Sequence, residues 1–360
     1  MASLFGNQIK VGIFGESHGP AIGVVIDGLP AGEAVDLETL AQFMARRAPG
    51  QGTHTTSRRE ADAVRVLAGL TNGITNGAPF AAMIENTNTR SADYRELMDT
   101  PRPGHADYTA YVKYGGHNDI SGGGHFSGRL TAPLCIAGGI ALQILLRRGI
   151  RVGAHIASIH DVPDMPLDFA SPDMEALARA ASRPLTTLSE EAGARMLAEI
   201  EKARVSQDSV GGVIECAATG LPVGLGAPMM DGVENRIAAV MFGIPAVRGI
   251  EFGAGFAAAR MTGSTHNDAF IMDGGSVHTA TNRHGGVLGG ITSGMPLIFR
   301  VALKPTPSIA QEQDTISLVE KRPAKLAVHG RHDPCIVPRA VPCVEAAAAI
   351  TILDLLEEGV

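Results

Sequence analysis

The sequence has few cysteines, and their spacing excludes the usual cysteine-based sites. Its four cysteines are Cys135, Cys216, Cys335 and Cys343, and no two of them form a CxxC pair. None stands at metal-ligand spacing from a pair of histidines. We therefore expect neither a disulfide framework nor a structural metal site, and we expect a reducing, cytoplasmic environment.

The sequence also lacks an excess of positive charge and a clear membrane segment. Its 37 acidic residues outnumber its 30 lysines and arginines, which gives a formal net charge of −7. This balance predicts no general affinity for nucleic acid, so any positive site must be local. Residues 1–10 have no apolar core typical of a signal peptide. The longest uncharged run, residues 130–146, falls short of a membrane span and predicts a buried core helix.

No linker-like stretch, long charge run or repeat divides the chain, although 65 of its residues are glycine or proline. Strand-like segments bounded by Gly or Pro are frequent, and strands and helices mix without the regular alternation of a doubly wound sheet. We therefore predict one α+β domain over residues 1–360. The predicted strands are 9–14, 23–26, 63–67, 81–84, 151–159, 212–217 and 297–303.

Three helices have recognisable start signals. Asp36 is suited to cap a helix with an apolar stripe that ends at Pro49. Thr187 and Glu190 form the pattern of a capping box for a helix that runs to about residue 204. Pro342 fits the first helical position of an Ala-rich helix near the C-terminus.

One apparent cofactor motif does not hold. Residues 253–258 fit the pattern G-x-G-x-x-A, which in dinucleotide-binding proteins opens a helix whose N-terminus binds pyrophosphate. Here Gly263 interrupts the segment almost at once and no long apolar stripe follows. We therefore reject a Rossmann site, and no Walker loop, H-E-x-x-H or G-x-S-x-G motif is present.

Several glycine-rich loops each contain His, Arg or Ser. They are residues 15–19 with Ser17 and His18, 102–107 with His105 between Arg102 and Asp107, 122–129, 285–290, 304–308 and 330–334. Taken singly, each is normally a solvated or flexible turn. Asp107 is suited to orient His105 for acid–base work. Taken together in an acidic chain, the loops predict a local positive pocket for a small ligand with several negative charges.

Long and irregular sequence runs in these loops resemble the chorismate synthase family from end to end. The matching runs are GESHG and VVIDGLP (15–30), RRAPG (46–50), TTSRRE (55–60), RPGHADY (102–108), GGGHFSGR (122–129), PAVRGIEFG (245–253), GGVLGGITSG (285–294), LKPTPSI (303–309) and GRHDPC (330–335). The resemblance implies conversion of 5-enolpyruvylshikimate-3-phosphate to chorismate and phosphate. This 1,4-elimination requires reduced FMN without net redox change. It also implies an α+β sandwich with antiparallel sheets flanked by helices, assembled as a homotetramer.

The resemblance also implies roles for individual residues. In catalysis, His18 would stand near the leaving phosphate, His105 would act as an acid toward the flavin, and Asp333 would help to move a proton. The residues implied in substrate binding are Ser17, Arg47, Arg102 and Arg129, with Arg331 as a further cation. Those implied in FMN binding are His125, Phe126, Ser127, Pro245, Ala246, Gly289, Lys304, Pro305, Thr306, Pro307, Ser308 and Arg331.

Two departures from the family pattern leave local contacts open. Many relatives have Arg-Ser-Ser where this chain has residues 125–127, and many have Arg where Thr53 stands. Two alternative functions also remain at this point, a non-catalytic FMN- or phosphate-binding protein and a nicotinamide-dependent oxidoreductase. The intact His18 and His105 argue against the first. Whether the protein reduces its own flavin with NADPH is a separate question that the sequence leaves open.

Overall fold

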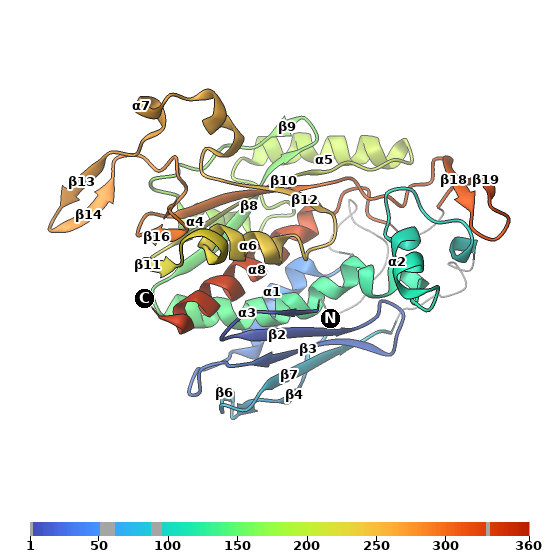
Figure 1. The fold of residues 1–360 in the computed structure, drawn as a ribbon, viewed down its shortest axis with the longest axis horizontal. Coiled ribbons are helices and arrows are strands. Elements are labelled where there is room, and N and C mark those ends of the chain that lie inside the picture. Colours follow the sequence, from blue (N-terminus) through green and yellow to red (C-terminus); the bar gives the residue numbers. More distant parts are fainter. Residues whose placement is uncertain (1–2, 51–61, 88–95, 329–331, 360) are drawn as a thin grey trace.

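The structure is a computed structural model, which describes residues 3–50, 62–87, 96–328 and 332–359. Two five-stranded antiparallel sheets lie on opposite sides of a central layer of helices (Figure 1). The central helices are α1 (Leu37–Arg47), α3 (Thr131–Arg147) and α8 (Val337–Glu358). Two more helices, α4 (Met174–Ala180) and α5 (Glu190–Val205), cover the outer face of the second sheet. This α+β sandwich confirms the predicted fold class.

Within the described residues, both large sheets are built from antiparallel pairs only. The first has the order β1 (Leu4–Phe5), β2 (Lys10–Gly15), β3 (Ala21–Asp27), β7 (Phe80–Glu85), β4 (Arg65–Ala68). The second has the order β12 (Val247–Phe252), β17 (Leu297–Leu303), β10 (Gly212–Thr219), β8 (Arg151–Ile159), β9 (Val162–Pro163). All seven predicted strands are present, and β8 and β17 coincide with their predicted ranges.

The second sheet is buried on both faces, and its sequence reflects this. Along β17, side chains on both faces are buried. Helix α8 packs on one face of the sheet, against β8 and β10, and α4 packs on the opposite face, against β8 (Figure 1). Leu297, Ile298 and Phe299 are three consecutive residues with no exposed surface. A continuous apolar run is typical of such a strand, whereas a strand with one wet face alternates.

Helix α3 is the predicted core helix. The stretch Gly128–Arg147 is apolar and long enough to cross a membrane, yet 83% of its most apolar window is buried inside the protein. It packs very closely on α8: a Cβ atom built on Gly138 would lie 2.2 Å from the Cα of Ala346. Glycine is therefore required at position 138, because any side chain would push the two helices apart.

Two predicted helix starts are wrong. Ser189, not Thr187, caps α5, since its side chain accepts a hydrogen bond from the Ala192 N–H. Asp164 accepts the N–H groups of residues 188 and 189, which keeps the chain extended up to that point. Helix α8 begins five residues before Pro342, because the carbonyl of Ile336 accepts the first helical hydrogen bonds. Pro342 thus lies inside the helix, at the cost of one backbone bond. The Asp36 cap of α1 is confirmed.

The segment 253–258 does not open an α-helix, in agreement with the rejected dinucleotide motif. It forms the 3-10 helix η6 (Gly255–Arg260) directly after β12. The remaining strands form a three-stranded sheet and hairpins, with these bounds: β11 (Val223–Gly226), β16 (Ile291–Ser293), β15 (Val287–Leu288), β13 (Phe270–Asp273), β14 (Ser276–Thr279), β18 (Gln313–Ser317), β19 (Arg322–Leu326), β5 (Leu70–Thr71) and β6 (Ile74–Thr75). The remaining helices are α2 (Asp107–Tyr114), α6 (Val233–Met241) and α7 (Gly263–His266), with the 3-10 segments η2 (Glu96–Met98), η3 (Ser121–Phe126), η4 (Gly128–Leu130) and η5 (Met229–Asp231).

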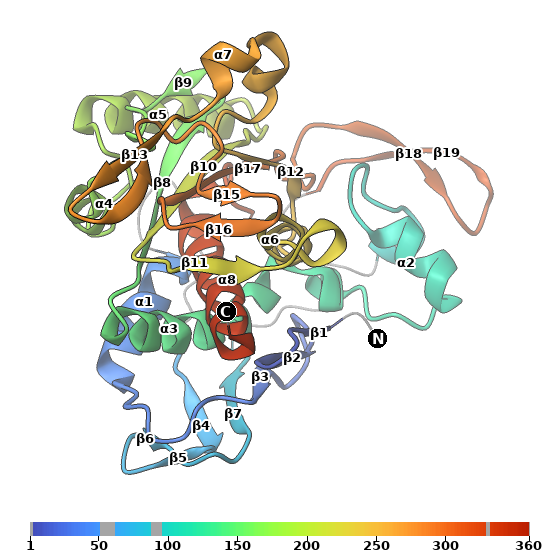
Figure 2. The same ribbon diagram turned by 60° about the vertical axis from the view of Figure 1, so that its left-hand side comes forward.

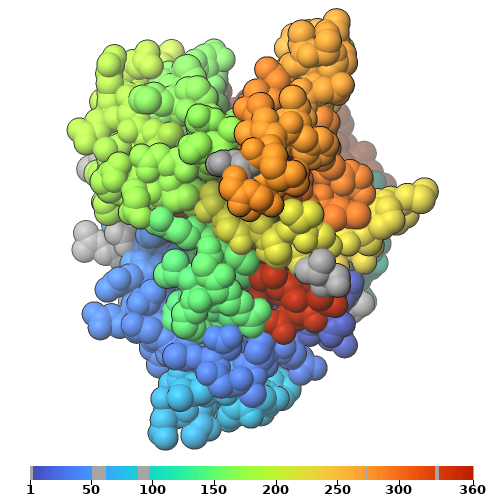
Figure 3. All heavy atoms as spheres, turned by 90° about the vertical axis from the view of Figure 1, so that its left-hand side faces the viewer, coloured from blue at the N-terminus to red at the C-terminus, as the bar shows by residue number. Residues whose placement is uncertain are grey.

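Two parts of the chain project from the sandwich at opposite ends. The β18–β19 hairpin and α2 extend at the end where α3 and α8 begin, and the β13–β14 hairpin extends at the other end (Figures 1 and 2). Figure 3 shows the orange atoms of the β13–β14 region on the face turned to the viewer. This hairpin exposes large apolar side chains, among them Phe270 at 68% and Met272 at 71%.

Candidate active site

A cavity of about 610 Å³ lies where α3 and α8 begin, next to α2. It is lined by residues from glycine-rich loops that are far apart in the sequence. The predicted site residues that line it are Ser17, Arg47, Arg102, His105, His125, Phe126, Ser127, Arg129, Pro245, Ala246, Lys304, Thr306, Pro307, Ser308 and Asp333. The tertiary structure therefore brings most of the predicted residues together in one place.

Some predicted residues do not line this cavity. His18 and Pro305 are each next to a lining residue in the chain. Gly289 lies in the turn between β15 and β16, outside the lining, so its contact with FMN stays a prediction. Arg331, Thr53 and the TTSRRE run at 55–60 lie outside the described residues.

The loop containing His18 is held against the triple glycine of η3. Gly122, Gly123 and Gly124 all have positive φ, at 62°, 87° and 52°. A Cβ atom on Gly122 would lie 2.1 Å from Nδ1 of His18, and the Ser17 N–H donates to the carbonyl of Gly124 at 3.1 Å. The glycines adopt this backbone without steric cost and leave room for the loop. His18 is thereby fixed beside Gly122, which lines the cavity.

Arg102, His105 and Asp107 form one buried hydrogen-bonded group. The carboxylate of Asp107 accepts from Nε and Nη2 of Arg102, both at 2.8 Å, and from the Arg102 backbone N–H at 3.0 Å. Its Oδ1 lies 2.6 Å from Nδ1 of His105. Burial opposes ionisation, but the hydrogen bonds from Arg102 and His105 hold the pKa of Asp107 well below its usual range. Asp107 thus orients His105, as the sequence predicted.

This geometry determines the tautomer of His105. Arg102 Nη2 also lies 3.1 Å from Nδ1 of His105, but a guanidinium can only donate. An ionised carboxylate only accepts, so the short contact with Asp107 requires the proton to sit on Nδ1. Nε2 is then the atom at which His105 can take up a second proton and release it again. Nε2 would lie 3.5 Å from a Cβ built on the lining residue Gly123. The arrangement is that of an oriented acid–base histidine.

His332 lines the cavity, and in the sequence it is a candidate cation of the loop 330–334. Burial and the positive charge of Arg102 lower the pKa of His332 to about 4, while Asp333 acts in the opposite direction. Its imidazole is therefore neutral at physiological pH. It adds hydrogen-bonding capacity beside His105 without adding charge.

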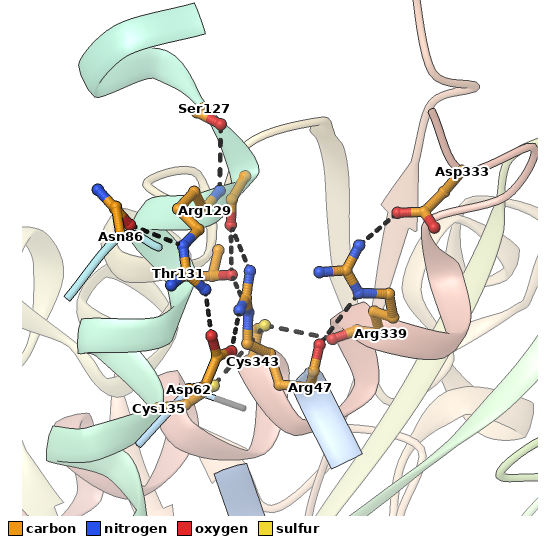
Figure 4. Close-up of polar contacts among 11 residues, drawn as sticks. Arg47, Asp62, Asn86, Ser127, Arg129, Thr131, Cys135, Asp333, Arg339 and Cys343 are labelled. Carbon is orange, nitrogen blue, oxygen red and sulfur yellow. Dashed lines mark hydrogen bonds and ion pairs between the residues drawn. The ribbon is translucent and has the colours of Figure 1, made fainter. Parts of the chain in front are cut away.

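Arg47 and Arg129 share one buried carboxylate, that of Asp62 (Figure 4). Arg47 Nη1 donates to Oδ2 at 2.5 Å, and Arg129 Nη1 pairs with Oδ1. Asn86 accepts from Arg129 Nε at 3.2 Å, and Thr131 accepts from Arg47 Nε at 3.1 Å. Burial disfavours the charge of Asp62, but the two arginines outweigh it and lower the pKa of this carboxyl group. One carboxylate thus holds two cations at the cavity wall.

The sequence analysis missed Arg339, which enters the cavity from the first turn of α8. Its Nη1 donates to Oδ2 of Asp333 at 2.5 Å, and its Nε donates to the carbonyl of Arg47 at 3.0 Å. The predicted catalytic Asp333 is therefore paired with a cation of its own. No local pattern could have identified Arg339, because it is brought to the cavity by the packing of α8.

The strand β17 leads into the proline-containing segment 304–308, which forms another wall. The Lys304 N–H donates to the carbonyl of Ala246, an alanine with φ of 74°, and its ammonium group contacts the carbonyl of Gly104. Within the described part of the chain, the buried Oγ1 of Thr306 has no hydrogen-bond partner. An unpaired buried hydroxyl in a cavity wall is a candidate ligand contact, since leaving it unsatisfied is costly.

The unusual His125 has protein partners. Its Nδ1 lies 2.9 Å from the carbonyl oxygen of Gly15, and its Nε2 lies 2.9 Å from Oγ of Ser3. His125 thus connects the triple-glycine loop to the first sheet.

Across the described residues, no group of three or more His, Cys, Asp or Glu side chains is arranged to hold a metal ion.

The family model described as chorismate synthase matches residues 9–356. The chain belongs to the chorismate synthase family. It is 46% identical to the chorismate synthase of Lancefieldella parvula, which it matches over 99% of this chain and 96% of that one. It is 47% identical to that of Thermococcus gammatolerans, over 98% and 96%. A crystal structure of a chorismate synthase superimposes with a TM-score of 0.78 at 27% identity, covering 98% of this chain and 93% of that one.

Membership of this family establishes the reaction and the fold that the sequence runs indicated. The reaction is the 1,4-elimination of phosphate from 5-enolpyruvylshikimate-3-phosphate to give chorismate, in the shikimate pathway of aromatic amino-acid biosynthesis. The enzyme is a carbon–oxygen lyase acting on phosphates. The family is one that uses reduced flavin. The two alternatives, a non-catalytic binding protein and a nicotinamide-dependent oxidoreductase, are thereby set aside.

Proposed function

We propose that the cavity described above binds 5-enolpyruvylshikimate-3-phosphate together with reduced FMN, and that His18, His105 and Asp333 carry out the proton transfers. The observation that supports this most strongly is the local charge. Five cationic side chains line the cavity of an otherwise acidic protein: Arg47, Arg102, Arg129, Lys304 and Arg339.

The substrate's charge suits this wall. The substrate carries two carboxylates and a phosphate. In the protein, the arginines already pair with three buried carboxylates, those of Asp62, Asp107 and Asp333. The five cations exceed these three carboxylates, which leaves the wall positive. Arginines held by buried carboxylates are also preorganised, so they stabilise a departing phosphate without reorganising. Ser17 and the cations Arg47, Arg102 and Arg129 would contact the substrate, and Arg331 belongs to the same proposal.

The residues present suit FMN as well. The unpaired Oγ1 of Thr306 and the ammonium group of Lys304 lie on the proline-containing segment and offer polar contacts. The other residues that would hold FMN are His125, Phe126, Ser127, Pro245, Ala246, Gly289, Pro305, Pro307, Ser308 and Arg331. When bound, reduced FMN supplies an electron that is lent to the substrate and recovered, which explains a cofactor in a reaction without net oxidation.

The protein's own residues then move protons and neutralise charge. His105, with Nδ1 held by Asp107, presents Nε2 as an acid toward the flavin. His18, which lies beside the lining residue Gly122, would donate a proton to the leaving phosphate. Asp333, which pairs with Arg339, would accept a proton. The neutral His332 lines the same cavity next to Asp333 in the chain and can pass a hydrogen bond without changing the charge balance.

We extend the proposal to the whole protein. It would be a single domain of residues 1–360, located in the cytoplasm, free of nucleic acid and membrane partners, and assembled as a homotetramer. The exposed apolar side chains of the β13–β14 hairpin support a subunit contact there. Sedimentation velocity across a concentration range would show a monomer if the tetramer is wrong.

The deciding experiment is an anaerobic assay with purified protein, substrate and chemically reduced FMN. We expect chorismate and phosphate in equal amounts, while flavin absorbance shows that the flavin stays reduced over many turnovers. One flavin oxidised per product, or NADPH consumed in proportion to product, would contradict the proposed chemistry. Binding of both ligands without product would contradict the proposed roles of the cavity residues.

Single substitutions test the two histidines. His18→Ala and His105→Ala should each lose on the order of 10²–10⁴-fold in kcat while folding and binding both ligands. His117→Ala, at an exposed position after α2 and outside the cavity lining, is the matched control and should keep full activity. Losses below about tenfold in both variants would return these histidines to ordinary loop residues.

A further inference from the structure

Two cysteines that the proposed mechanism does not use lie side by side (Figure 4), and one of them, Cys343, belongs to the cavity lining, at a place that we call the cavity floor. Sγ of Cys135, on α3, is 3.8 Å from Sγ of Cys343, on α8. All four cysteines lie within the described ranges, and of these only Cys343 lines the cavity. The pair therefore connects α3 and α8 at the cavity floor.

We propose that Cys343 is a peroxide-reactive thiol and that Cys135 resolves its oxidised form into a Cys135–Cys343 disulfide, which switches the enzyme off. The sequence placed both residues in a reducing environment and assigned neither a role. The inference concerns thiol chemistry at the cavity floor, and only its effect on activity rests on the proposed function.

The surroundings of the two sulfurs differ, and this difference assigns their roles. Cys135 donates to the sulfur of Cys343, and Arg47, Thr131 and Arg339 act on the same atom. These groups outweigh burial and lower the pKa of Cys343, whereas burial raises the pKa of Cys135. In its neutral form Cys343 donates to the carbonyl of Arg339 at 3.4 Å. Because the thiolate is the nucleophile, Cys343 attacks and Cys135 remains the protonated partner.

The steps balance with a hydroperoxide as the oxidant. The Cys343 thiolate attacks one peroxide oxygen, the O–O bond breaks, and hydrogen peroxide with one proton yields a sulfenic acid and water. The sulfur of Cys135 then attacks the sulfenic sulfur, an S–S bond forms, and the hydroxyl leaves as water with the thiol proton. A dithiol reductant reverses the change.

The helices allow this bond at a cost to the site. A disulfide needs the two sulfurs about 2.05 Å apart, so they must approach by more than 1 Å. Further along the same two helices, Gly138 and Ala346 are already in close contact, which leaves mainly the turns before them to adjust. The first turn of α3 carries Thr131, a partner of Arg47, and begins two residues after Arg129. Displacing catalytic groups by about 1 Å can reduce a rate on the order of 10²-fold.

The test is a hydrogen peroxide titration of the native full-length protein, followed by alkylation and peptide mass mapping. We expect a Cys135–Cys343 cross-link, chorismate formation reduced at least about tenfold, and recovery of both with dithiothreitol. Cys216 and Cys335 should be alkylated only after unfolding, since burial raises the pKa of both thiols. Cys135→Ala should give a dimedone adduct at Cys343 in place of the cross-link, while Cys216→Ala should oxidise like the wild type.

The outcomes separate clearly. No cross-link, or oxidation spread equally over all four cysteines, would overturn the thiol assignment. A cross-link with unchanged activity would overturn the switch. If the reduced protein itself makes no chorismate, the proposed function fails, whereas the cross-link read by mass still decides the chemistry of the pair.

Discussion

Replacing Asp107 with asparagine tests how the site prepares His105. Asp107 accepts three hydrogen bonds from Arg102 and lies 2.6 Å from Nδ1 of His105, and its side chain is 5% exposed. The substitution keeps the shape and removes the negative charge. The buried guanidinium of Arg102 then loses its counter-charge, and the His105 imidazolium loses the group that stabilises and orients it.

Both effects have expected magnitudes. Breaking a buried ion pair by removing one partner costs about 3–5 kcal/mol, and because asparagine keeps one acceptor oxygen we expect about 3 kcal/mol of lost stability. A positioned acid contributes on the order of 10²–10⁴-fold in rate, and the loss of its orienting carboxylate should remove most of this. We therefore expect Asp107→Asn to fold with a lower melting temperature and to turn over at least about a hundredfold more slowly.

The sign of the pH dependence is a further check. The pKa of Asp107 is lowered by folding, so its contribution to stability is present above its unfolded pKa, about 3.9, and is lost as the pH falls through the folded value. The wild type should therefore lose stability in acid more steeply than Asp107→Asn.

The assay is kcat under anaerobic conditions at saturating substrate and reduced FMN, with a denaturation curve for each protein. Asp314→Asn, at a side chain that is 87% exposed, is the control and should behave as the wild type. If Asp107→Asn keeps more than about a third of the wild-type kcat while both ligands bind normally, the orientation of His105 by Asp107 does not matter to the reaction.

Three other predictions follow from the buried charges. Arg129→Ala should weaken substrate binding roughly ten- to a hundredfold, as expected for a lost hydrogen bond to a charged group, and should weaken FMN binding less. Separate titrations with each ligand test this, and an unchanged substrate affinity would show that Arg129 does not bind the substrate. Burial opposes the charge of His155, but Asp164 and Glu215 outweigh this effect and raise the pKa of His155. The stability that its charged form contributes is therefore present below about pH 6.5 and is lost as the pH rises through the folded pKa. Urea unfolding should show this pH dependence in the wild type but not in His155→Gln, and equal pH dependence in both proteins would contradict it. Asp354→Asn should cost about 3–5 kcal/mol, because the fully buried carboxylate pairs with Arg236 and accepts three backbone N–H groups from residues 7–9; chemical denaturation measures this, and a loss below about 1 kcal/mol would refute it.

The sequence by itself determined the elements whose signal is local. The uncharged run at 130–146 became α3, and the apolar segments at 151–159 and 297–303 became β8 and β17. Side-chain periodicity and length report burial directly, so such segments can be recognised without knowing their neighbours. The irregular glycine-rich loops likewise identified the family and most of the cavity residues. Glycine is favoured at backbone positions with positive φ, and binding residues are concentrated on loops, so both can be recognised in a sequence.

Where a helix begins was decided by distant contacts. The hydrogen bonds that Asp164 accepts moved the start of α5 to Ser189, and the carbonyl of Ile336 moved the start of α8 ahead of Pro342. A capping pattern is a short-range preference worth about 1 kcal/mol, and tertiary hydrogen bonds of similar strength can override it.

The partners of the charged groups were also decided by the tertiary structure. Asp62 lies 67 residues from Arg129, and Cys135 lies 208 residues from Cys343. Arg339 reaches the cavity because α8 packs against α3 with almost no gap at Gly138. Residue type and spacing show which groups can carry charge or react, but pairing depends on how two helices approach each other. That approach is set by the packing of the whole core, so only the folded structure could show it.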